Sequence, residues 1–208
     1  MNWQPPLQLL TWSAAAFLCG AIPFSVVIGK LALRTDIRAY GDGNPGATNV
    51  LRASASAHPG AKAWGLLAMV LDMAKGALPV AIAYEILDIR DFRIVPIALA
   101  PVLGHMASPF LRWHGGKGVA VTGGIWIGLT QGIGAIIGIV LMSIGYALLE
   151  GAGWAVALGM AAIGVYLVAW HCDRVLLVVW ITNTLLILWR HRDDLRTGPA
   201  IRHRRNVR

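Results

Sequence analysis

The sequence predicts an all-α, polytopic membrane protein with about seven transmembrane helices. Of its 208 residues, 57% are hydrophobic and 13% are charged, and the mean hydropathy is +0.63. Several apolar stretches reach the roughly 20 residues that a helix needs to cross a bilayer. Three polar clusters interrupt them: GDGNPGATNVLR (41–52), WHGGKGVAVTGG (113–124) and WRHRDDLR (189–196).

The charge distribution indicates orientation in a membrane. The formal net charge is +8, and arginines crowd the C-terminal end. A basic segment beside a membrane helix is typical of the cytoplasmic side, near anionic lipid, so we expect no nucleic-acid partner. Cys19 and Cys172 lie far apart and match no metal-binding or redox spacing, which predicts neither a metal site nor a cofactor.

The first two helices are expected over residues 7–33 and 61–86. Gly20 and Pro23 allow a bend or a close contact in the first. The loop after it is basic, whereas the preceding N-terminal residues carry no charge, which places the N-terminus outside. Asp72 and Lys75 share one face of the second helix, where a structural ion pair and a role in the site both remain open.

The remaining chain supplies five further spans. Residues 94–111 contain three prolines and predict an irregular helix. Residues 118–150 are too long for one span, so we divide them near Thr130, and two more helices follow over 152–170 and 175–189. Both Lys117 and Arg190 carry charge typical of the inside, which requires an even number of crossings between them and a cytoplasmic C-terminus. Five spans with re-entrant pieces remain the alternative.

All three polar clusters then face the cytoplasm and predict one phosphate-handling site. Glycines with positive φ allow backbone N–H groups to converge on an anion. Lys117 and Arg52 supply positive charge, and Asn44, Thr48 and Asn49 supply further polar groups. GGKG lacks the spacing of a P-loop, and the chain contains no nucleophile elbow.

Five segments resemble, in order and spacing, the bacterial acyl-phosphate:glycerol-3-phosphate acyltransferases, the PlsY family. They are GxIPFxxxIGK from Gly20, GDGNPGATNVLR from Gly41, LDMAKG from Leu71, GHMASPFLRWHGGKGVA from Gly104 and LLILWRHRDDLR from Leu185. The resemblance implies a multi-pass enzyme of the bacterial cell membrane with a cytoplasmic active site. It also implies one membrane domain over residues 1–190 and a basic tail over 191–208.

The implied reaction transfers a fatty acyl group from acyl phosphate to the 1-hydroxyl of glycerol 3-phosphate. Its product is lysophosphatidic acid, an intermediate of phospholipid synthesis, and it needs no cofactor or metal. By this resemblance, Lys117 and Arg52 bind phosphate and His191 holds or polarises glycerol 3-phosphate. The other implied binding residues are Asp42, Gly43, Asn44, Thr48, Asn49, His105, Gly115, Gly116, Gly118 and Asp194. The oligomeric state stays open.

Three departures from the family pattern keep other functions open. The family usually has serine at the position of Asp42, asparagine at that of Asp194 and a serine within the segment corresponding to residues 145–148. A carboxylate about 4 Å from a phosphate costs roughly 4 kcal/mol at an effective dielectric near 20. One alternative is therefore a catalytically silent paralogue that binds lipid phosphate or a partner enzyme. A transporter of a phosphorylated metabolite is another, although no internal repeat supports it.

Overall fold

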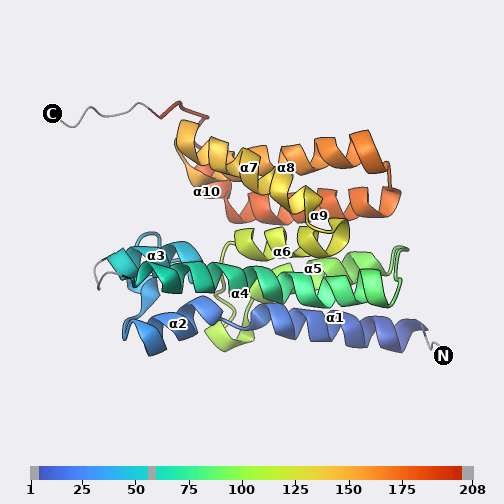
Figure 1. The fold of residues 1–208 in the computed structure, drawn as a ribbon, viewed down its shortest axis with the longest axis horizontal. Coiled ribbons are helices and arrows are strands. Elements are labelled where there is room, and N and C mark those ends of the chain that lie inside the picture. The colour runs from blue at the N-terminus through green and yellow to red at the C-terminus, as the bar shows by residue number, and fades with distance from the viewer. Residues whose placement is uncertain (1–4, 56–59, 203–208) are drawn as a thin grey trace.

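The computed structural model describes residues 5–55 and 60–202, where the regular structure is helical apart from one isolated bridge between Leu149 and Ile201. Figure 1 shows the longer helices lying side by side along the long axis of the molecule. The helices are α1 (Pro5–Ala21), α2 (Phe24–Ala32), α3 (Ala47–Ala55), α4 (Lys62–Ala81), α5 (Ile94–Met106), α6 (Val119–Thr130), α7 (Ile133–Leu148), α8 (Ala152–Tyr166), α9 (Arg174–Arg190) and α10 (Arg192–Leu195). The all-α prediction is confirmed.

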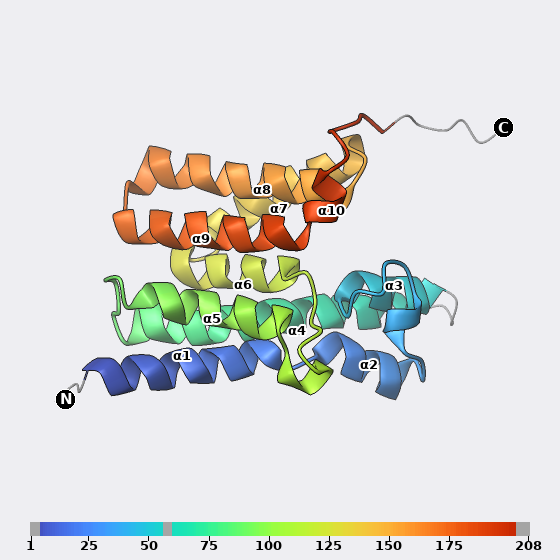
Figure 2. The ribbon, with the colours of Figure 1, turned by 180° about the vertical axis from the view of Figure 1, so that it is seen from behind.

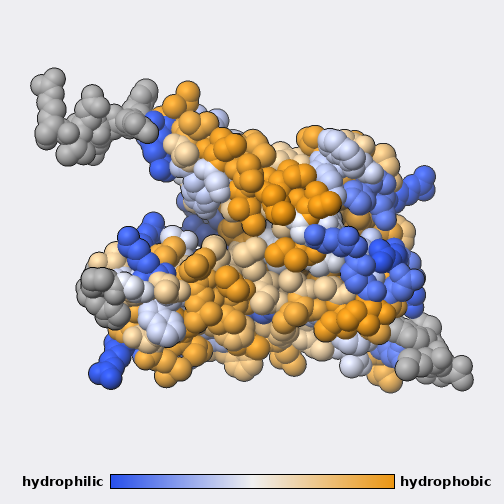
Figure 3. All heavy atoms as spheres, in the orientation of Figure 1, coloured by the Kyte–Doolittle hydropathy of each residue, from blue (hydrophilic) through white to orange (hydrophobic). Residues whose placement is uncertain are grey.

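The surface of this bundle suits a membrane. Four helical stretches are long and apolar enough to cross one: Pro6–Ala32, Lys62–Ile86, Ile94–Leu111 and Ala152–His171. Two further apolar helices, α6 and α7, are shorter. Figure 3 shows hydrophobic surface between hydrophilic residues gathered toward both ends of the molecule. Figures 1 and 2 show that α1 begins at one of these ends and that α10 lies at the other.

The first predicted span is bent at Pro23. The helix α1 ends at Ala21 and α2 begins at Phe24, because proline lacks the N–H that a continuous helix requires. Just before the bend, Gly20 lies against the backbone of Pro101 in α5. A side chain at position 20 would collide with that backbone, so this glycine lets α1 and α5 pack closely.

The ion pair between Asp72 and Lys75, one of two alternatives left open for the second helix, is present and buried. Lys75 Nζ lies 2.7 Å from Asp72 Oδ1, with only 1% and 3% of the two side chains exposed. Ser25 Oγ donates to Asp72 Oδ2 at 2.9 Å, and Lys75 Nζ donates to the Ile22 carbonyl at 2.7 Å. The pair therefore joins α4 to the bend around Pro23.

The helix α6 lies at the centre of the bundle and buries most of its residues. Gly76 of α4 faces the backbone of Val121, while Gly124 and Gly128 of α6 face the backbone of α4. Small residues allow such close approach between helices that have no room for side chains in between. This packing fixes the start of α6, and with it the neighbouring Lys117.

The chain turns between α6 and α7 where the sequence predicted it. Gln131 and Gly132 have φ values of 51° and 89°, in the left-handed region that commonly ends a helix. The hydroxyl of Thr130 accepts a hydrogen bond from the Gly134 N–H at 3.0 Å. The prediction of two helices within residues 118–150 is confirmed.

A short helix occupies part of the segment that the sequence analysis treated as a loop. The helix α3 begins directly after Gly46, whose carbonyl accepts the N–H groups of Asn49 and Val50. It buries Asn49, Val50 and Ala53 and packs along α4. Its buried residues gather on one face, but with only nine residues the helix is too short for that pattern to be recognised reliably in the sequence.

The end of the described chain packs back onto the bundle. Gly153 at the start of α8 faces Asp194 and Leu195 of α10, and Trp154 Nε1 donates to the Thr197 carbonyl at 2.8 Å. The third polar cluster is thereby held against α8. The predicted basic tail over 191–208 lies partly outside the described residues.

Candidate functional site

The three polar clusters meet at the side chain of Lys117. Its Nζ lies 3.1 Å from Asp42 Oδ2 and 3.3 Å from Asp194 Oδ2. Figures 1 and 2 show α3 and α10 on the same side of the molecule, with the start of α6 facing that side. The side chain of Lys117 is 28% exposed, and those of Asp42 and Asp194 are 47% and 31% exposed. Solvent therefore reaches this ion-paired centre.

The first cluster forms a tight turn around a buried amide. Gly41 and Gly43 have φ values of 60° and 71°, which a glycine adopts without strain. Asp42 Oδ1 accepts hydrogen bonds from the Asn44 N–H and from Asn49 Nδ2, both at 3.2 Å. Asn49 Nδ2 also donates to the Asn44 carbonyl at 2.9 Å. Buried Asn49 thus fixes the turn and the Asp42 carboxylate together.

The same amide orients Arg52. Asn49 Oδ1 accepts a hydrogen bond from Arg52 Nη1 at 3.2 Å, and the guanidinium lies so close to Gly41 that a side chain there would collide with it. A guanidinium has five N–H donors, so this bond leaves others able to bind an anion. Thr48, in contrast, is exposed on α3.

The glycine segment before α6 is held from two sides. The N–H groups of Gly115 and Gly116 donate to the carbonyls of Met106 and His105, at 3.1 and 3.0 Å. Arg190 Nη2 donates to the carbonyls of Gly115 and Gly116 at 2.8 and 3.1 Å. The two N–H groups expected to cradle a phosphate are thus engaged with the end of α5 in this structure.

His105 lies beneath this segment. It is buried, and a side chain at Gly116 would collide with its imidazole ring. Gly118 has a φ of 88°, and α6 begins at the next residue. The first N–H groups of a helix lack partners within it and attract negative charge. The start of α6 therefore supplies donors beside Lys117 that Gly115 and Gly116 do not.

His191 follows α9 and is almost completely buried. Its Nδ1 lies 2.8 Å from the Ile187 carbonyl, and because a carbonyl only accepts, Nδ1 carries the proton. Burial lowers the pKa of His191 below its ordinary value, although the bond to Ile187 acts in the opposite direction. In the neutral ring, Nε2 is then left as a hydrogen-bond acceptor.

The ion pairs keep the centre charged at neutral pH. Burial alone would lower the pKa of Lys117, but the bonds and charges of Asp42 and Asp194 raise it overall. Burial alone would raise the pKa of Asp42, but Lys117 and the Asn44 N–H lower it overall. Among residues 5–55 and 60–202, no three His, Cys, Asp or Glu side chains gather to hold a metal ion.

Two residues of this region were missed by sequence reasoning. Arg190 holds the glycine segment, yet the sequence does not distinguish it from the other arginines of its cluster. Tyr146 in α7 interacts electrostatically with Lys117, Asp42 and Asp194. Tyr146 lies within residues 145–148, the segment in which the family usually has a serine and this chain has none. The helical periodicity of α7, which sets the face of the helix on which Tyr146 lies, is the signal that would have indicated this residue.

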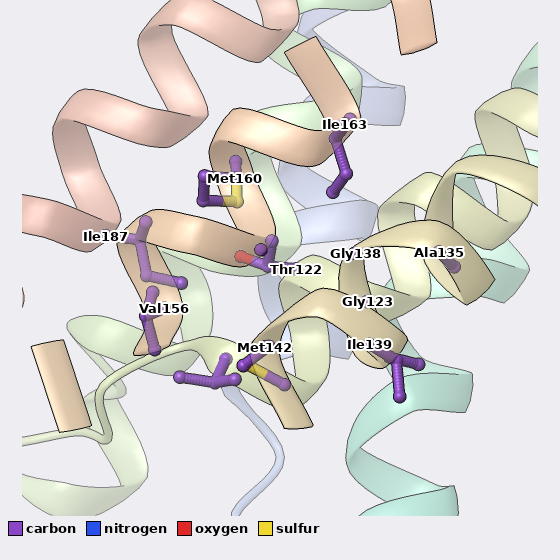
Figure 4. A pocket seen from close by; sticks show the side chains of 12 residues that line it. Thr122, Gly123, Ala135, Gly138, Ile139, Met142, Val156, Met160, Ile163 and Ile187 are labelled. Atoms are coloured by element: carbon purple, nitrogen blue, oxygen red, sulfur yellow. The ribbon is translucent and has the colours of Figure 1, made fainter. Parts of the chain in front are cut away.

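The bundle also contains an apolar cavity. It lies among α6, α7, α8 and α9, and Figure 4 shows aliphatic and methionine side chains around it, with Thr122 as the polar exception. Val119, two residues after Lys117, and Ile187, one turn before His191, both line it. The polar centre and the cavity therefore share the ends of α6 and α9.

Comparisons with known proteins agree with this architecture. The family model described as glycerol-3-phosphate acyltransferase matches residues 10–198. A glycerol-3-phosphate acyltransferase of Anaeromyxobacter dehalogenans (strain 2CP-1 / ATCC BAA-258) is 36% identical over 195 residues, covering 88% of this chain and 90% of the relative. One of Pseudomonas syringae pv. syringae (strain B728a) is 35% identical over 190 residues, covering 91% and 93%.

Two solved structures have a similar fold. Both are crystal structures of PlsY (YgiH), described as an integral membrane glycerol 3-phosphate acyltransferase. The glycerol 3-phosphate form superposes with a TM-score of 0.79 at 31% identity, and the lysophosphatidic acid form with 0.77 at 29%. Each comparison covers 91% of this chain and 90% of the other.

Proposed function

This chain belongs to the glycerol-3-phosphate acyltransferase family, and from that premise we propose that it takes its acyl group from acyl phosphate. The acyl group passes to the 1-hydroxyl of glycerol 3-phosphate, which gives lysophosphatidic acid and inorganic phosphate. This proposal depends mainly on the environment of Lys117. Its ammonium contacts carboxylates of the first and third clusters, and an apolar cavity begins two residues later, at Val119. Such a centre suits a reaction between a phosphate-bearing acceptor and a lipid-like donor.

The residues divide into phosphate ligands and a hydroxyl ligand. Lys117, Arg52 and the first N–H groups of α6 bind phosphate, because each offers charge or unpaired donors at the same end of the bundle. His191 accepts a hydrogen bond from the acceptor hydroxyl through Nε2, since its Nδ1 is bonded to Ile187. Asn44 and Asn49 act on the substrate through the turn that they stabilise.

The acyl chain binds in the cavity among α6 to α9. Its lining is aliphatic apart from Thr122, and burying methylene groups there is favourable by about 0.8 kcal/mol each. Because Val119 and Ile187 border the polar centre, an acyl carbon at that border lies next to Lys117 and His191. This placement brings the donor's phosphate to the cations and its chain into the bundle.

The chemical step needs little from the protein beyond positioning. The acceptor hydroxyl oxygen attacks the acyl carbon, the bond between that carbon and the phosphate oxygen breaks, and phosphate leaves with the electron pair. A substrate phosphate takes the hydroxyl proton. Acyl phosphate is a mixed anhydride with a good leaving group, so orientation and charge stabilisation supply the main acceleration.

The site faces the cytoplasm in a seven-span arrangement. The shorter helices α6, α7 and α9 complete the crossings, so the N-terminus lies outside and the C-terminus inside. The positive-inside rule supports this orientation, because Lys30, Arg34, Arg38 and Arg52 lie at or after the end of the first span, whereas only Arg90 and Arg93 follow the second. Reporter fusions after Glu85 and at the C-terminus test it, and an external C-terminus would overturn it.

Transfer of labelled glycerol 3-phosphate into lipid tests whether acyl phosphate is the acyl donor. Purified protein in lipid receives acyl phosphate or acyl-CoA in parallel, and labelled lipid is counted for the unaltered chain, Lys117→Ala and Lys62→Ala. Lys62 is an exposed cation at the start of α4 and serves as the matched control. We expect transfer from acyl phosphate alone, abolished only by Lys117→Ala. Transfer from acyl-CoA alone would overturn the proposed donor.

A further inference from the structure

Two carboxylates hold the ammonium that the proposed reaction assigns to phosphate. Asp42 Oδ2 and Asp194 Oδ2 lie 3.1 and 3.3 Å from Lys117 Nζ. An ammonium has three N–H donors on a compact charge, so two carboxylates occupy most of its capacity. A phosphate that approached Lys117 with both carboxylates in place would meet two like charges at short range.

Resting on the proposed function, we propose that Asp42 and Asp194 are positioning residues that compete with phosphate for Lys117. They hold the ammonium between the first and third clusters, the ammonium turns from them to a substrate phosphate, and both ion pairs form again as inorganic phosphate leaves. Both carboxylates therefore weaken phosphate binding and favour release of the phosphate product. They set the affinity of the site without touching the reacting atoms.

The surroundings of Asp42 suit this exchange. Its Oδ1 is held by the Asn44 N–H and by Asn49 Nδ2, while its Oδ2 faces Lys117. The carboxylate therefore keeps its position when the ammonium turns to another anion. The exchange requires movement of the lysine, whose long side chain has several rotatable bonds, rather than movement of the turn.

Asp194 is fixed by a different element. It lies in α10, which packs against Gly153 at the start of α8, and its carbonyl accepts the Thr197 hydroxyl at 3.0 Å. The two competitors thus approach Lys117 from segments that are far apart in the chain. Either one can be removed while the other continues to hold the ammonium.

The chain offers a matched control for each competitor. Asp36 precedes the first cluster and pairs with Arg38 at 2.7 Å, and Asp193 adjoins Asp194 and pairs with Arg196 at 3.0 Å. Asp36→Asn and Asp193→Asn alter the net charge of the same end of the molecule by the same amount. Neither substitution removes a partner of Lys117, so they isolate the effect of contact from the effect of charge.

Steady-state kinetics and phosphate binding test the proposal. For Asp42→Asn, Asp194→Asn, the double variant and both controls, we measure KM for glycerol 3-phosphate, kcat and inhibition by inorganic phosphate. Binding of inorganic phosphate is also titrated by ³¹P NMR. For each single variant we expect KM and the phosphate inhibition constant to fall about fivefold, as for loss of a partly exposed ion pair. We expect a larger fall in the double variant, no rise in kcat and no change in the controls.

Phosphate binding that is unchanged or weaker in both Asp→Asn variants, relative to the controls, would overturn the proposal. Thermal unfolding verifies that each variant is folded, and Asp42→Ser or Asp194→Ser replaces an asparagine variant that is not. The titration with inorganic phosphate does not depend on turnover. If the unaltered chain transferred no acyl group from acyl phosphate, the proposed function would fail while the competition between carboxylates and phosphate would still be decided.

Discussion

Two lysines of this protein pair with aspartates in opposite ways. Lys75 bonds to Asp72 within one helix, and both side chains are nearly excluded from solvent. Lys75 also donates to the Ile22 carbonyl, and the Ser25 hydroxyl donates to Asp72. Lys117 is more than a quarter exposed and bonds to carboxylates from two distant segments. Burial makes the first pair a permanent connection between helices, whereas exposure makes the second exchangeable. Burial and the origin of the partners distinguish Lys75 from Lys117, the lysine that we propose binds phosphate.

Removing one member of the buried pair should have the largest effect. Lys75→Met leaves Asp72 buried without its partner, which costs about 3–5 kcal/mol. We expect a marked fall in the temperature of thermal unfolding in detergent. The double variant Asp72→Leu with Lys75→Met should recover much of the loss, because both charges are gone. A loss from Lys75→Met no greater than that from Lys62→Met would remove the distinction between the two lysines.

The same substitution at Lys117 should affect activity instead. Lys117→Met removes the ammonium at which charge develops, and loss of one such group lowers kcat by about 10²–10³-fold. Its unfolding temperature should stay close to that of the unaltered chain, because exposed ion pairs contribute only about 0–1 kcal/mol. Unfolding and acyl-transfer assays on the same preparations measure both. A strongly destabilised Lys117→Met would mean that this lysine is structural as well.

A third test concerns the support of Lys117. Arg190 donates from one nitrogen to the carbonyls of both Gly115 and Gly116, and lysine cannot reproduce the planar guanidinium. Arg190→Lys should therefore lower kcat by roughly tenfold, the value of about one lost hydrogen bond to a charged group. Arg192→Lys, at an exposed position two residues later, is the control. Equal kinetics for the two variants would show that Arg190 does not position the glycine segment.

The smallest expected effect is a change of stability with pH. Burial lowers the pKa of His191, so the unfolded chain binds a proton at a higher pH than the folded chain does. Stability should therefore be complete above the ordinary histidine pKa of about 6.5 and should fall as the pH drops through it. His191→Gln should lose this part of the pH dependence of the unfolding temperature, whereas exposed His114→Gln should keep it. Identical profiles for both variants would contradict the inference.

Local patterns in the sequence predicted much of the fold. Pro23 marked the bend between α1 and α2, Gln131 and Gly132 marked the turn before α7, and a spacing of three marked the pair of Asp72 and Lys75. Each of these depends on residues that are neighbours in the chain. The helix α3 was not predicted, because nine residues are too few for its apolar face to be recognised in the sequence; in the structure it packs along α4.

The composition of the site was predictable, but its connections were not. Lys117, Asp42 and Asp194 were all expected in one site, yet nothing in the sequence indicated that the two carboxylates would bond to the lysine. The paired residues are about 75 positions apart in the sequence, and their contacts depend on how the other helices place α6 and α10. The N–H groups of Gly115 and Gly116 looked available, and the carbonyls of α5 that accept them could not be identified from the sequence.

The short length of α6 affects how deep in the bundle its first residue lies. Its 12 residues span about 18 Å, against a hydrocarbon layer of roughly 30 Å. Figure 1 shows α6 ending short of α4 on the side of α3 and α10. The start of α6, which Lys117 precedes by two residues, therefore lies deeper along the bundle than the start of α4. In the proposed reaction, the acyl chain can then lie in the apolar cavity among α6 to α9 while the water-soluble acceptor reaches Lys117 from the polar end of the bundle.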